Sequence, residues 1–388
     1  MESKVLKTVV VYLGGLLTGL SLIIYPALGP IFTDSAHFGF SSNQFSSIFI
    51  PQTILAIFSA LLTPFFVSKW GVKNVLLQGC ISLAFTLFLL FMSHFFIHEK
   101  TKALFLIYSG TCFLGLGFGL VITVLNPLAF QLFPNNELAS ISGLHFSLGL
   151  GTAGAPLLVS MLHNPNLWWY LPLIVFALVL ILLVFVLFLN LNKQENTLQA
   201  STLKIPLRLW GFVLIVILYG ICEGTLGSYG AVFLKNQGFS IKTAAVGLAL
   251  FWGGLAFGRI VFGLLSARFK MKGITLLSAL LIVFMFYLIP MSTVENWSLL
   301  GMALVGILMS SLFPSSVNWA TQENTSQAIM VSGLMVASLQ FGTGISTNFL
   351  GFLSAIYPLA LLFKWMGLIA FGMVGLMWYM QKKSKSKS

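Results

Sequence analysis

Long apolar runs are the feature that most constrains how this chain can fold. A helix needs about 20 predominantly apolar residues to cross a bilayer. Runs of about that length cover residues 5–32, 44–67, 74–97, 103–133, 138–161, 167–190, 209–234, 244–266, 273–294, 297–319, 328–353 and 358–380. Only 7% of the residues are charged, against about 25% in a soluble domain. The sequence therefore predicts an all-α, multi-pass membrane protein with twelve transmembrane helices, located in a cell membrane and, in a bacterium, the inner one.

The longest polar connection, from Asn190 to Arg208, falls after the sixth run. We therefore expect an N-terminal six-helix bundle over 1–190, a cytoplasmic linker over 191–208 and a C-terminal six-helix bundle over 209–381. A basic cytoplasmic tail follows over 382–388.

The basic residues indicate the orientation. With the N-terminus inside, fourteen Lys and Arg residues fall on the cytoplasmic side and five on the outer side, and Arg259 stays within the membrane. An excess of Lys and Arg marks cytoplasmic loops, so both termini are predicted to be cytoplasmic. The basic residues are scattered over short loops without a compact basic face, so the net charge of +12 does not indicate a nucleic-acid partner.

The two halves repeat each other. Two basic positions after the second run, Lys69 and Lys73, recur after the eighth as Arg268 and Lys272, at a constant separation of 199 residues. A helix broken by a proline, followed by a glycine-rich helix, also occurs in each half, at Pro127 and at Pro314. Parallel halves with breaks in matching positions are typical of secondary transporters whose site lies near the midplane.

The loop after the second run resembles the loop motif of the major facilitator superfamily, Gly-x-x-x-Asp-Arg/Lys-x-Gly-x-Arg/Lys. Lys69, Gly71 and Lys73 match it, whereas Ser68 replaces the acid and Pro64 the first glycine. The resemblance implies a gating loop, but one without its usual ion pair to a helix.

The loop after the eighth run is similar to the same motif. It keeps Gly263, Arg268 and Lys272 but has Ala267 in place of the acid. With both acids lost, we expect other contacts to hold the inner helix ends together.

Within the superfamily, four fragments resemble the fucose permease-like branch of sugar:proton symporters. They are Asn126-Pro127, Leu144-His-Phe-Ser-Leu-Gly149, Tyr219-Gly-Ile-Cys-Glu223 and Phe257-Gly-Arg-Ile-Val-Phe-Gly263. The resemblance implies carboxylates in the first and fourth helices, but the matching positions hold Pro26 and Ile122. If the chain is proton-coupled, Glu223 or His145 must carry the proton.

Glu223 lies deep within the seventh run, whereas the other seven acidic residues fall in predicted loops or near the chain ends. An acid at the bilayer centre costs at least about 2.5 kcal/mol, so it is by default a functional candidate. A carboxyl group that is neutral in one conformation and charged in the other can couple proton flux to a conformational switch. The alternative is a structural Glu that ties its helix to a neighbour.

Two further ionisable residues lie within predicted helices. His145 titrates near neutrality in its unperturbed form, which suits coupling, but a lone membrane His can also be a packing residue. Arg259 is expected about two turns from the inner end of its helix, roughly 9 Å from the depth of Glu223 at about 1.5 Å per residue. It either reaches the interface or gates the inner side, or it faces the cavity and pairs with Glu223 or an anionic substrate.

Polar and aromatic side chains on these helices are candidates for binding a hydroxylated solute, because rings stack on it and amides bond to its hydroxyl groups. They are Gln52, Asn126, Tyr219, Trp252, Asn318, Gln340 and Asn348. Tyr219 stands one helical turn before Glu223, on the same face. The others can equally belong to the core or the lipid-facing aromatic belts.

Other functional classes lack support in the sequence. There is no phosphate-binding loop, no pattern of metal ligands and no nucleophile–base arrangement, so we expect neither an enzyme nor a cofactor or metal. The three cysteines lie in separate apolar runs and are interpreted as buried hydrophobic residues. The expected partners are a small-molecule substrate, the proton and the lipid bilayer, and the chain is expected to be a monomer.

These observations favour a secondary active transporter that takes up a small polar solute, such as a sugar or polyol, together with protons. One alternative is a proton-antiport exporter of a metabolite, drug or siderophore, because the same scaffold serves both directions. Another, from a different class, is a transporter-like sensor or assembly protein without flux.

Overall fold

The architecture was obtained as a computed structural model that describes residues 2–133, 137–162, 164–190, 206–265, 268–269, 271–323 and 328–385. Within these ranges every regular element is a helix. The elements before residue 190 are α1 (Glu2–Ala27), α2 (Gly29–Thr33), α3 (Ser42–Ser47), α4 (Phe49–Trp70), α5 (Val72–Met92), η1 (Ser93–Phe96), α6 (Lys100–Leu132), α7 (Glu137–Ser160), η3 (Pro165–Leu167) and α8 (Tyr170–Leu187). Those that follow are α10 (Leu207–Asn236), α11 (Ile241–Leu265), α12 (Met271–Met291), α13 (Glu295–Met309), α14 (Leu312–Gln322), α15 (Ala328–Leu353) and α16 (Leu359–Lys385).

The predicted twelve-helix membrane fold is confirmed. Ten helical stretches of the described chain are long and apolar enough to span a membrane, some of them built from two helices in succession, such as α13 with α14. The remaining two are α7 and α15, which are rich in Gly, Ser and Thr. They pack against α11 and α4 across the middle of the molecule, so much of their surface faces protein instead of lipid.

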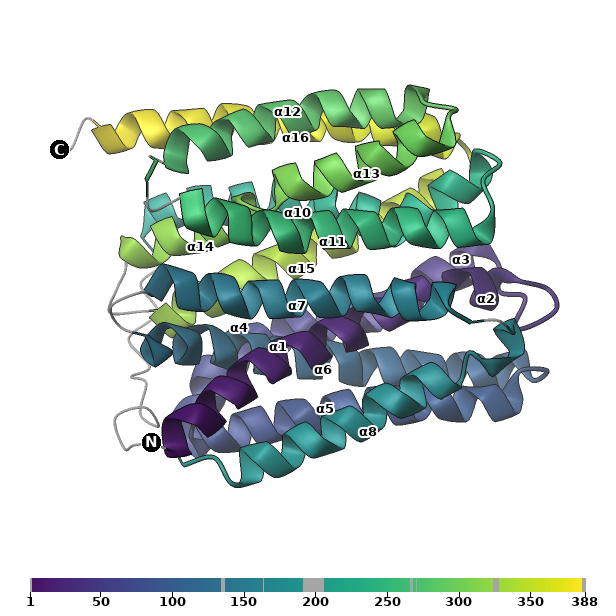
Figure 1. Cartoon of the computed structure of the whole chain (residues 1–388), viewed down its shortest axis with the longest axis horizontal. Helices are drawn as coiled ribbons and strands as arrows, with labels where there is room; N and C mark the ends of the chain where they lie inside the picture. The colour runs from purple at the N-terminus through teal and green to yellow at the C-terminus, as the bar shows by residue number, and fades with distance from the viewer. Residues whose placement is uncertain are drawn as a thin grey trace.

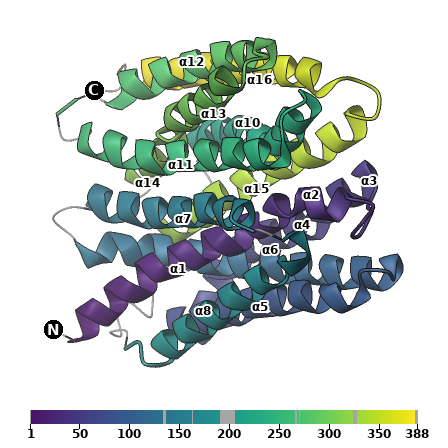
Figure 2. The ribbon, with the colours of Figure 1, turned by 45° about the vertical axis from the view of Figure 1, so that its right-hand side comes forward.

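The helices form two groups. Helices α1 to α8, the first half, lie in the lower part of Figure 1, and α10 to α16, the second half, lie in the upper part. Figure 2 shows the same separation after rotation. Both chain ends lie at one edge, here called the terminal side. The cytoplasmic location of this side stays a prediction, as does the boundary within 191–208, because residues 191–205 are outside the described ranges. Helix α16 continues to Lys385, so the predicted tail begins as helix.

Small residues let the two halves approach closely. A Cβ atom on Gly149 of α7 would lie 2.6 Å from the Cβ of Ala256 on α11. On the side away from the terminal side, a Cβ atom on Gly351 of α15 would lie 2.5 Å from the Cβ of Ser46 on α3. Glycine at such positions permits the backbone contact that packing between helices requires inside a membrane.

The proline positions behave differently in the two halves. In the second half the helix is interrupted between α13 and α14, because Pro314 has no N–H to donate to the carbonyl of Ser310. In the first half α6 runs through Pro127 as one helix to Leu132, so the predicted break there is wrong. The repeat between the halves is therefore one of helix order more than of helix shape.

The predicted gating loops lie on the terminal side, where they tie helices together within each half. Gly71 joins α4 to α5 with a φ of 81°, a conformation that favours glycine. The Nζ of Lys73 donates to the carbonyl of Leu187 at 2.6 Å. In the second half the side-chain amide of Gln381 donates to the carbonyl of Lys272 at 2.9 Å, in the matching place.

The other basic loop positions make looser contacts. The ammonium of Lys69 lies 5.9 Å from the centroid of the Trp70 ring, and Arg268 is exposed. An ion pair of 2.8 Å between Arg208 and Glu323 joins α10 to the end of α14. Ala267, one of the two positions where the motif's acid is missing, lies outside the described residues, and a gating role for the loops stays a prediction.

Candidate functional site

A cavity of about 900 Å³ lies between the two halves near the middle of the membrane-spanning helices. Four helices of the first half line it, α1, α4, α6 and α7, and four of the second, α10, α11, α14 and α15. Its polar and charged lining residues are Gln52, Thr53, His145, Thr152, Glu223, Ser228, Trp252, Arg259, Gln340, Thr343 and Thr347. Secondary transporters built from two repeated halves bind their substrates in a central cavity of this kind.

Contacts between the halves lie on both sides of this cavity. On the terminal side the amide of Asn126 donates to the hydroxyl of Ser332 at 2.9 Å, joining α6 to α15. On the opposite side Gly351 meets Ser46, as described above. Contacts between helices of the two halves therefore lie both on the terminal side of the cavity and on the opposite side.

Glu223 lies at the middle of α10, buried, with its carboxyl group on the cavity. The hydroxyl of Tyr219 donates to its Oε1 at 2.9 Å from one turn earlier in the same helix, as their spacing predicts. Close to this pair α10 is glycine-rich, and a Cβ atom on Gly224 would lie 2.8 Å from the Cα of Thr343. The close approach of α15 leaves the carboxyl group facing the cavity.

Arg259 is buried in α11, with its guanidinium within the protein. Its Nη1 donates to the backbone carbonyl of His145 at 2.7 Å, which joins α11 of the second half to α7 of the first. The same guanidinium interacts electrostatically with Glu223 and Tyr219. Arg259 and Glu223 therefore line the same cavity from neighbouring helices.

His145 lines the cavity from α7. Its ring meets the ring of Phe313 edge to face, with centroids 5.7 Å apart and an interplanar angle of 85°. The backbone carbonyl, not the ring, bonds to Arg259. The Nε2 atom of the ring is buried and has no hydrogen-bond partner among the described residues.

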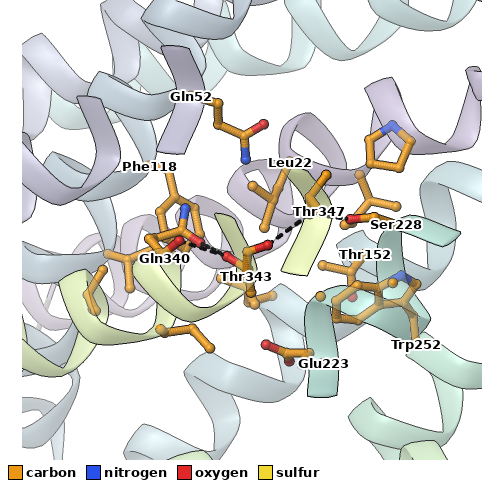
Figure 3. Close-up of a pocket in the computed structure, with 18 of the residues that line it drawn as sticks. Leu22, Gln52, Phe118, Thr152, Glu223, Ser228, Trp252, Gln340, Thr343 and Thr347 are labelled. Carbon is orange, nitrogen blue, oxygen red and sulfur yellow. Dashed lines mark hydrogen bonds between the residues drawn. The ribbon is translucent and has the colours of Figure 1, made fainter. Parts of the chain in front are cut away.

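A ladder of hydroxyl groups runs along the α15 wall of the cavity (Figure 3). The hydroxyl of Thr343 donates to the backbone and side-chain oxygens of Gln340 at 3.1 and 3.3 Å. Thr347 donates to the carbonyl of Thr343 at 2.8 Å and shares a 3.0 Å hydrogen bond with Ser228 of α10. In this view Gln52 and Glu223 lie on opposite sides of the ladder.

Several polar atoms at the cavity have no partner within the described chain. These are Oε1 of Gln52, Nε1 of Trp252, Nε2 of His145 and Nε of Arg259. Buried polar groups in proteins are nearly always hydrogen-bonded. A polar ligand in the cavity would supply these acceptors and donors with partners.

The comparisons with known proteins agree with this arrangement. A family model described as Major Facilitator Superfamily matches residues 11–347. The chain belongs to the major facilitator superfamily. As a member of it, the chain is a membrane transporter protein and not an enzyme, and the predicted family resemblance is confirmed.

Among its relatives within the superfamily is the glucose/mannose transporter GlcP of Bacillus subtilis (strain 168), which is 25% identical over 332 residues, 81% of this chain and 80% of the relative. Three solved superfamily structures share the fold. FucP in the outward conformation has a TM-score of 0.74 at 16% identity, covering 97% of this chain and 99% of that one. A single-residue variant of the E. coli fucose:proton symporter FucP has a TM-score of 0.71 at 15% identity and covers 98% of both chains. A single-residue mutant of the nucleoside transporter NupG also has a TM-score of 0.71 at 15% identity, covering 97% of this chain and 99% of that one.

Not every residue predicted for the site of this superfamily member faces the cavity. Glu223, His145, Trp252, Gln52, Gln340 and Arg259 line it, and Tyr219 contacts it through Glu223. Asn126 is buried in the contact with Ser332. Asn348 donates back to the carbonyl of Gly344 in its own helix at 2.9 Å. Asn318 lies in a second, smaller cavity of about 450 Å³ on the terminal side, here called the inner crevice.

The two positions at which the resemblance to the fucose permease-like branch implies carboxylates, Pro26 and Ile122, do line the cavity. Neither side chain can bind a proton. Among the described lining residues Glu223 is therefore the one carboxylic acid.

Sequence reasoning missed the hydroxyl ladder of Thr343, Thr347 and Ser228. A signal for it exists, because Gln340, Thr343 and Thr347 follow each other at spacings of three and four residues, which place them on one helix face. Serine and threonine are common in membrane helices at packing contacts, so this signal alone does not separate a cavity from an interface.

Proposed function

We propose that the protein is a proton-coupled symporter that carries a sugar or polyol into the cytoplasm by alternating access. It works as a monomer, since one chain supplies both halves of the cavity. The observation that carries the proposal is the set of unpartnered polar atoms beside an acid and aromatic rings in one central cavity.

The polar atoms support a hydroxylated substrate. Each buried donor or acceptor without a partner costs about 1–3 kcal/mol. A sugar hydroxyl group both donates and accepts, so it can bond to Oε1 of Gln52 as a donor and to Nε1 of Trp252 as an acceptor. The rings of Trp252 and Phe118 supply apolar surface for the C–H faces of a pyranose. The name of the relative GlcP, a glucose/mannose transporter, supports hexoses as the first candidates.

The acid supports proton coupling. Glu223 faces the cavity, and a proton that binds it there enters the same compartment as the substrate. A proton on the carboxylate removes a buried negative charge, which changes the relative stability of the two conformations. His145 is the second titratable group on the cavity.

The contacts between the halves support alternating access. The contacts on the terminal side and those on the opposite side would open in turn to admit and release the substrate. Rocking of two halves about a central site is the general mechanism of carriers with repeated halves.

Uptake into proteoliposomes tests the proposal. With glucose, mannose and fucose as labelled substrates, we expect counterflow for at least one sugar, and accumulation when the lumen is made alkaline. A protonophore should abolish accumulation but leave counterflow. Liposomes without protein are the control. Absence of counterflow for every sugar and polyol would remove the substrate class, and uptake that ignores the pH gradient would remove the proton.

A further inference from the structure

The inner crevice holds polar groups that the proposed transport of a sugar does not use. It lies between α7 of the first half and α11, α12 and α14 of the second, with a volume of about 450 Å³. None of the described residues in its wall is acidic. The wall carries one positive charge and several hydrogen-bonding groups, and its polar and charged residues are Ser142, Arg259, Ser310, Ser311, Ser315 and Asn318.

Two buried atoms in this wall have no hydrogen-bond partner among the described residues. They are the Nε of Arg259 and the Oγ of Ser311, and the two residues are 6% and 3% exposed. The guanidinium is fixed through its other end, because Nη1 donates to the backbone carbonyl of His145 at 2.7 Å. Buried polar groups are nearly always hydrogen-bonded. A ligand in the crevice would supply both atoms with a partner.

The remaining polar groups of α14 follow one face of that helix. Ser311, Ser315 and Asn318 stand four and then three residues apart, a spacing that places them on the same side. Seven residues at about 1.5 Å each make a row of roughly 10 Å. The row begins at the buried Ser311 and reaches the half-buried Asn318, nearer to the end of α14 where Glu323 pairs with Arg208. The crevice therefore has a buried end and an entrance towards the terminal side.

The charge of the wall favours an anion over a neutral solute. Glu223 interacts electrostatically with Arg259 from the central cavity, whereas the crevice has no acid among its described residues. A guanidinium group matches the oxygens of a phosphate or carboxylate in both geometry and charge. Serine hydroxyl groups and an asparagine amide add further donors.

We propose that the inner crevice is a binding site for a small oxyanion, such as a phosphate monoester, that enters from the terminal side. Arg259 and Ser311 bind its oxygens at the buried end, and the amide of Asn318 donates to it at the entrance. Because Ser142 belongs to the first half and the other lining residues to the second, the bound oxyanion joins the two halves. The site lies beyond the proposed function, since its occupation requires neither a sugar nor a pH gradient.

Calorimetric titration with inorganic phosphate tests the site on the full chain in nanodiscs of phosphatidylcholine, at one pH and one ionic strength. We expect the wild type to bind phosphate. Asn318→Asp adds a negative charge at the entrance and should weaken this binding by about tenfold or more through charge repulsion. Ser311→Ala removes one hydrogen-bond donor and should weaken it by about fivefold.

Asn74→Asp is the matched control, because Asn74 is an exposed residue of α5 in the first turn after the loop at Gly71. It adds the same charge on the same side of the molecule, away from the crevice, and should bind phosphate as the wild type does. Titration with glucose separates the two classes of ligand. If Ser311→Ala weakens glucose binding and leaves phosphate binding unchanged, the crevice takes a neutral solute and the proposal is wrong.

Nanodiscs that also contain phosphatidylglycerol distinguish a dissolved oxyanion from a lipid headgroup. An unchanged phosphate affinity supports the dissolved ligand, and competition by this lipid would overturn it in favour of the headgroup. Absence of phosphate binding to the wild type, or equal affinities in Asn318→Asp and Asn74→Asp, would overturn the site even if the protein carries a sugar. If phosphate binds with the expected losses while no sugar is carried, the site stands and the proposed function fails.

Discussion

At the residue scale, Glu223 can be separated into its acid chemistry and its hydrogen bond. Glutamine keeps the shape and an oxygen that can accept from Tyr219, but it cannot titrate. Glu223→Gln should therefore retain sugar counterflow within about twofold and lose accumulation driven by a pH gradient, because exchange requires no net proton movement. Both quantities can be measured in the same proteoliposomes.

Glu99→Gln is the control for Glu223, since Glu99 is an exposed acid that pairs with Lys102 at 2.6 Å away from the cavity. It should leave both counterflow and accumulation unchanged. Accumulation by Glu223→Gln at the wild-type level would show that Glu223 has no coupling role.

Trp252 offers the second test at this scale. Its Nε1 donor has no partner among the described residues, so we expect it to bond to a substrate hydroxyl. Trp252→Phe keeps an aromatic ring and removes the donor, which should weaken sugar binding by about tenfold for a loss of about 1.4 kcal/mol. Calorimetric titration measures the change, with Trp210→Phe at an exposed position of α10 as control. Equal affinities in the two variants would exclude the hydrogen bond.

How much of this site the sequence predicts depends on the kind of residue. Glu223 is evident because a buried acid is costly in a membrane, and its contact with Tyr219 follows from helix geometry alone. Whether Asn348 or Thr343 faces the cavity cannot be predicted from the sequence. Most of these helices are apolar on every side, so their rotation about their own axes leaves little trace in the sequence. The pairing of Arg259 with the His145 carbonyl joins two halves through a backbone atom, for which no residue type is specific.

At the scale of elements, the length of the helices follows from the thickness of a bilayer. Their number follows from the number of apolar runs of that length, which is why all twelve were predictable. Helices α7 and α15 are rich in small and polar residues, which lie at the contact between the halves. Prolines are tolerated inside membrane helices, so the unbroken course of α6 through Pro127 could not be predicted from the proline.

The contact of Gly351 with Ser46 gives a prediction at this scale. Gly351→Val places a branched side chain where a Cβ atom alone would lie 2.5 Å from the Ser46 Cβ, so α15 must move away from α3. In a background without the three native cysteines, Ser354→Cys in the neighbouring cleft should react faster with a hydrophilic maleimide. Sugar uptake should fall at least tenfold, because the opposite side no longer closes. Gly372→Val of α16 is the control, since a Cβ atom there meets nothing within 4 Å. Normal uptake by Gly351→Val would contradict a closing contact at this position.

At the scale of the whole molecule, the direction of transport depends on which side of the membrane the chain ends occupy. Both ends lie on the terminal side in the structure, and the excess of Lys and Arg predicts that this side is cytoplasmic. The terminal side would then be the side on which the cavity releases its substrate, as uptake requires. A green fluorescent protein fused after Ser388 should fluoresce, and alkaline phosphatase at the same position should be inactive. Both reporters inserted at Ile97–Glu99, between η1 and α6 on the other side, should give the reverse. If instead the phosphatase is active after Ser388, the terminal side faces outward and the orientation predicted from the basic residues is wrong.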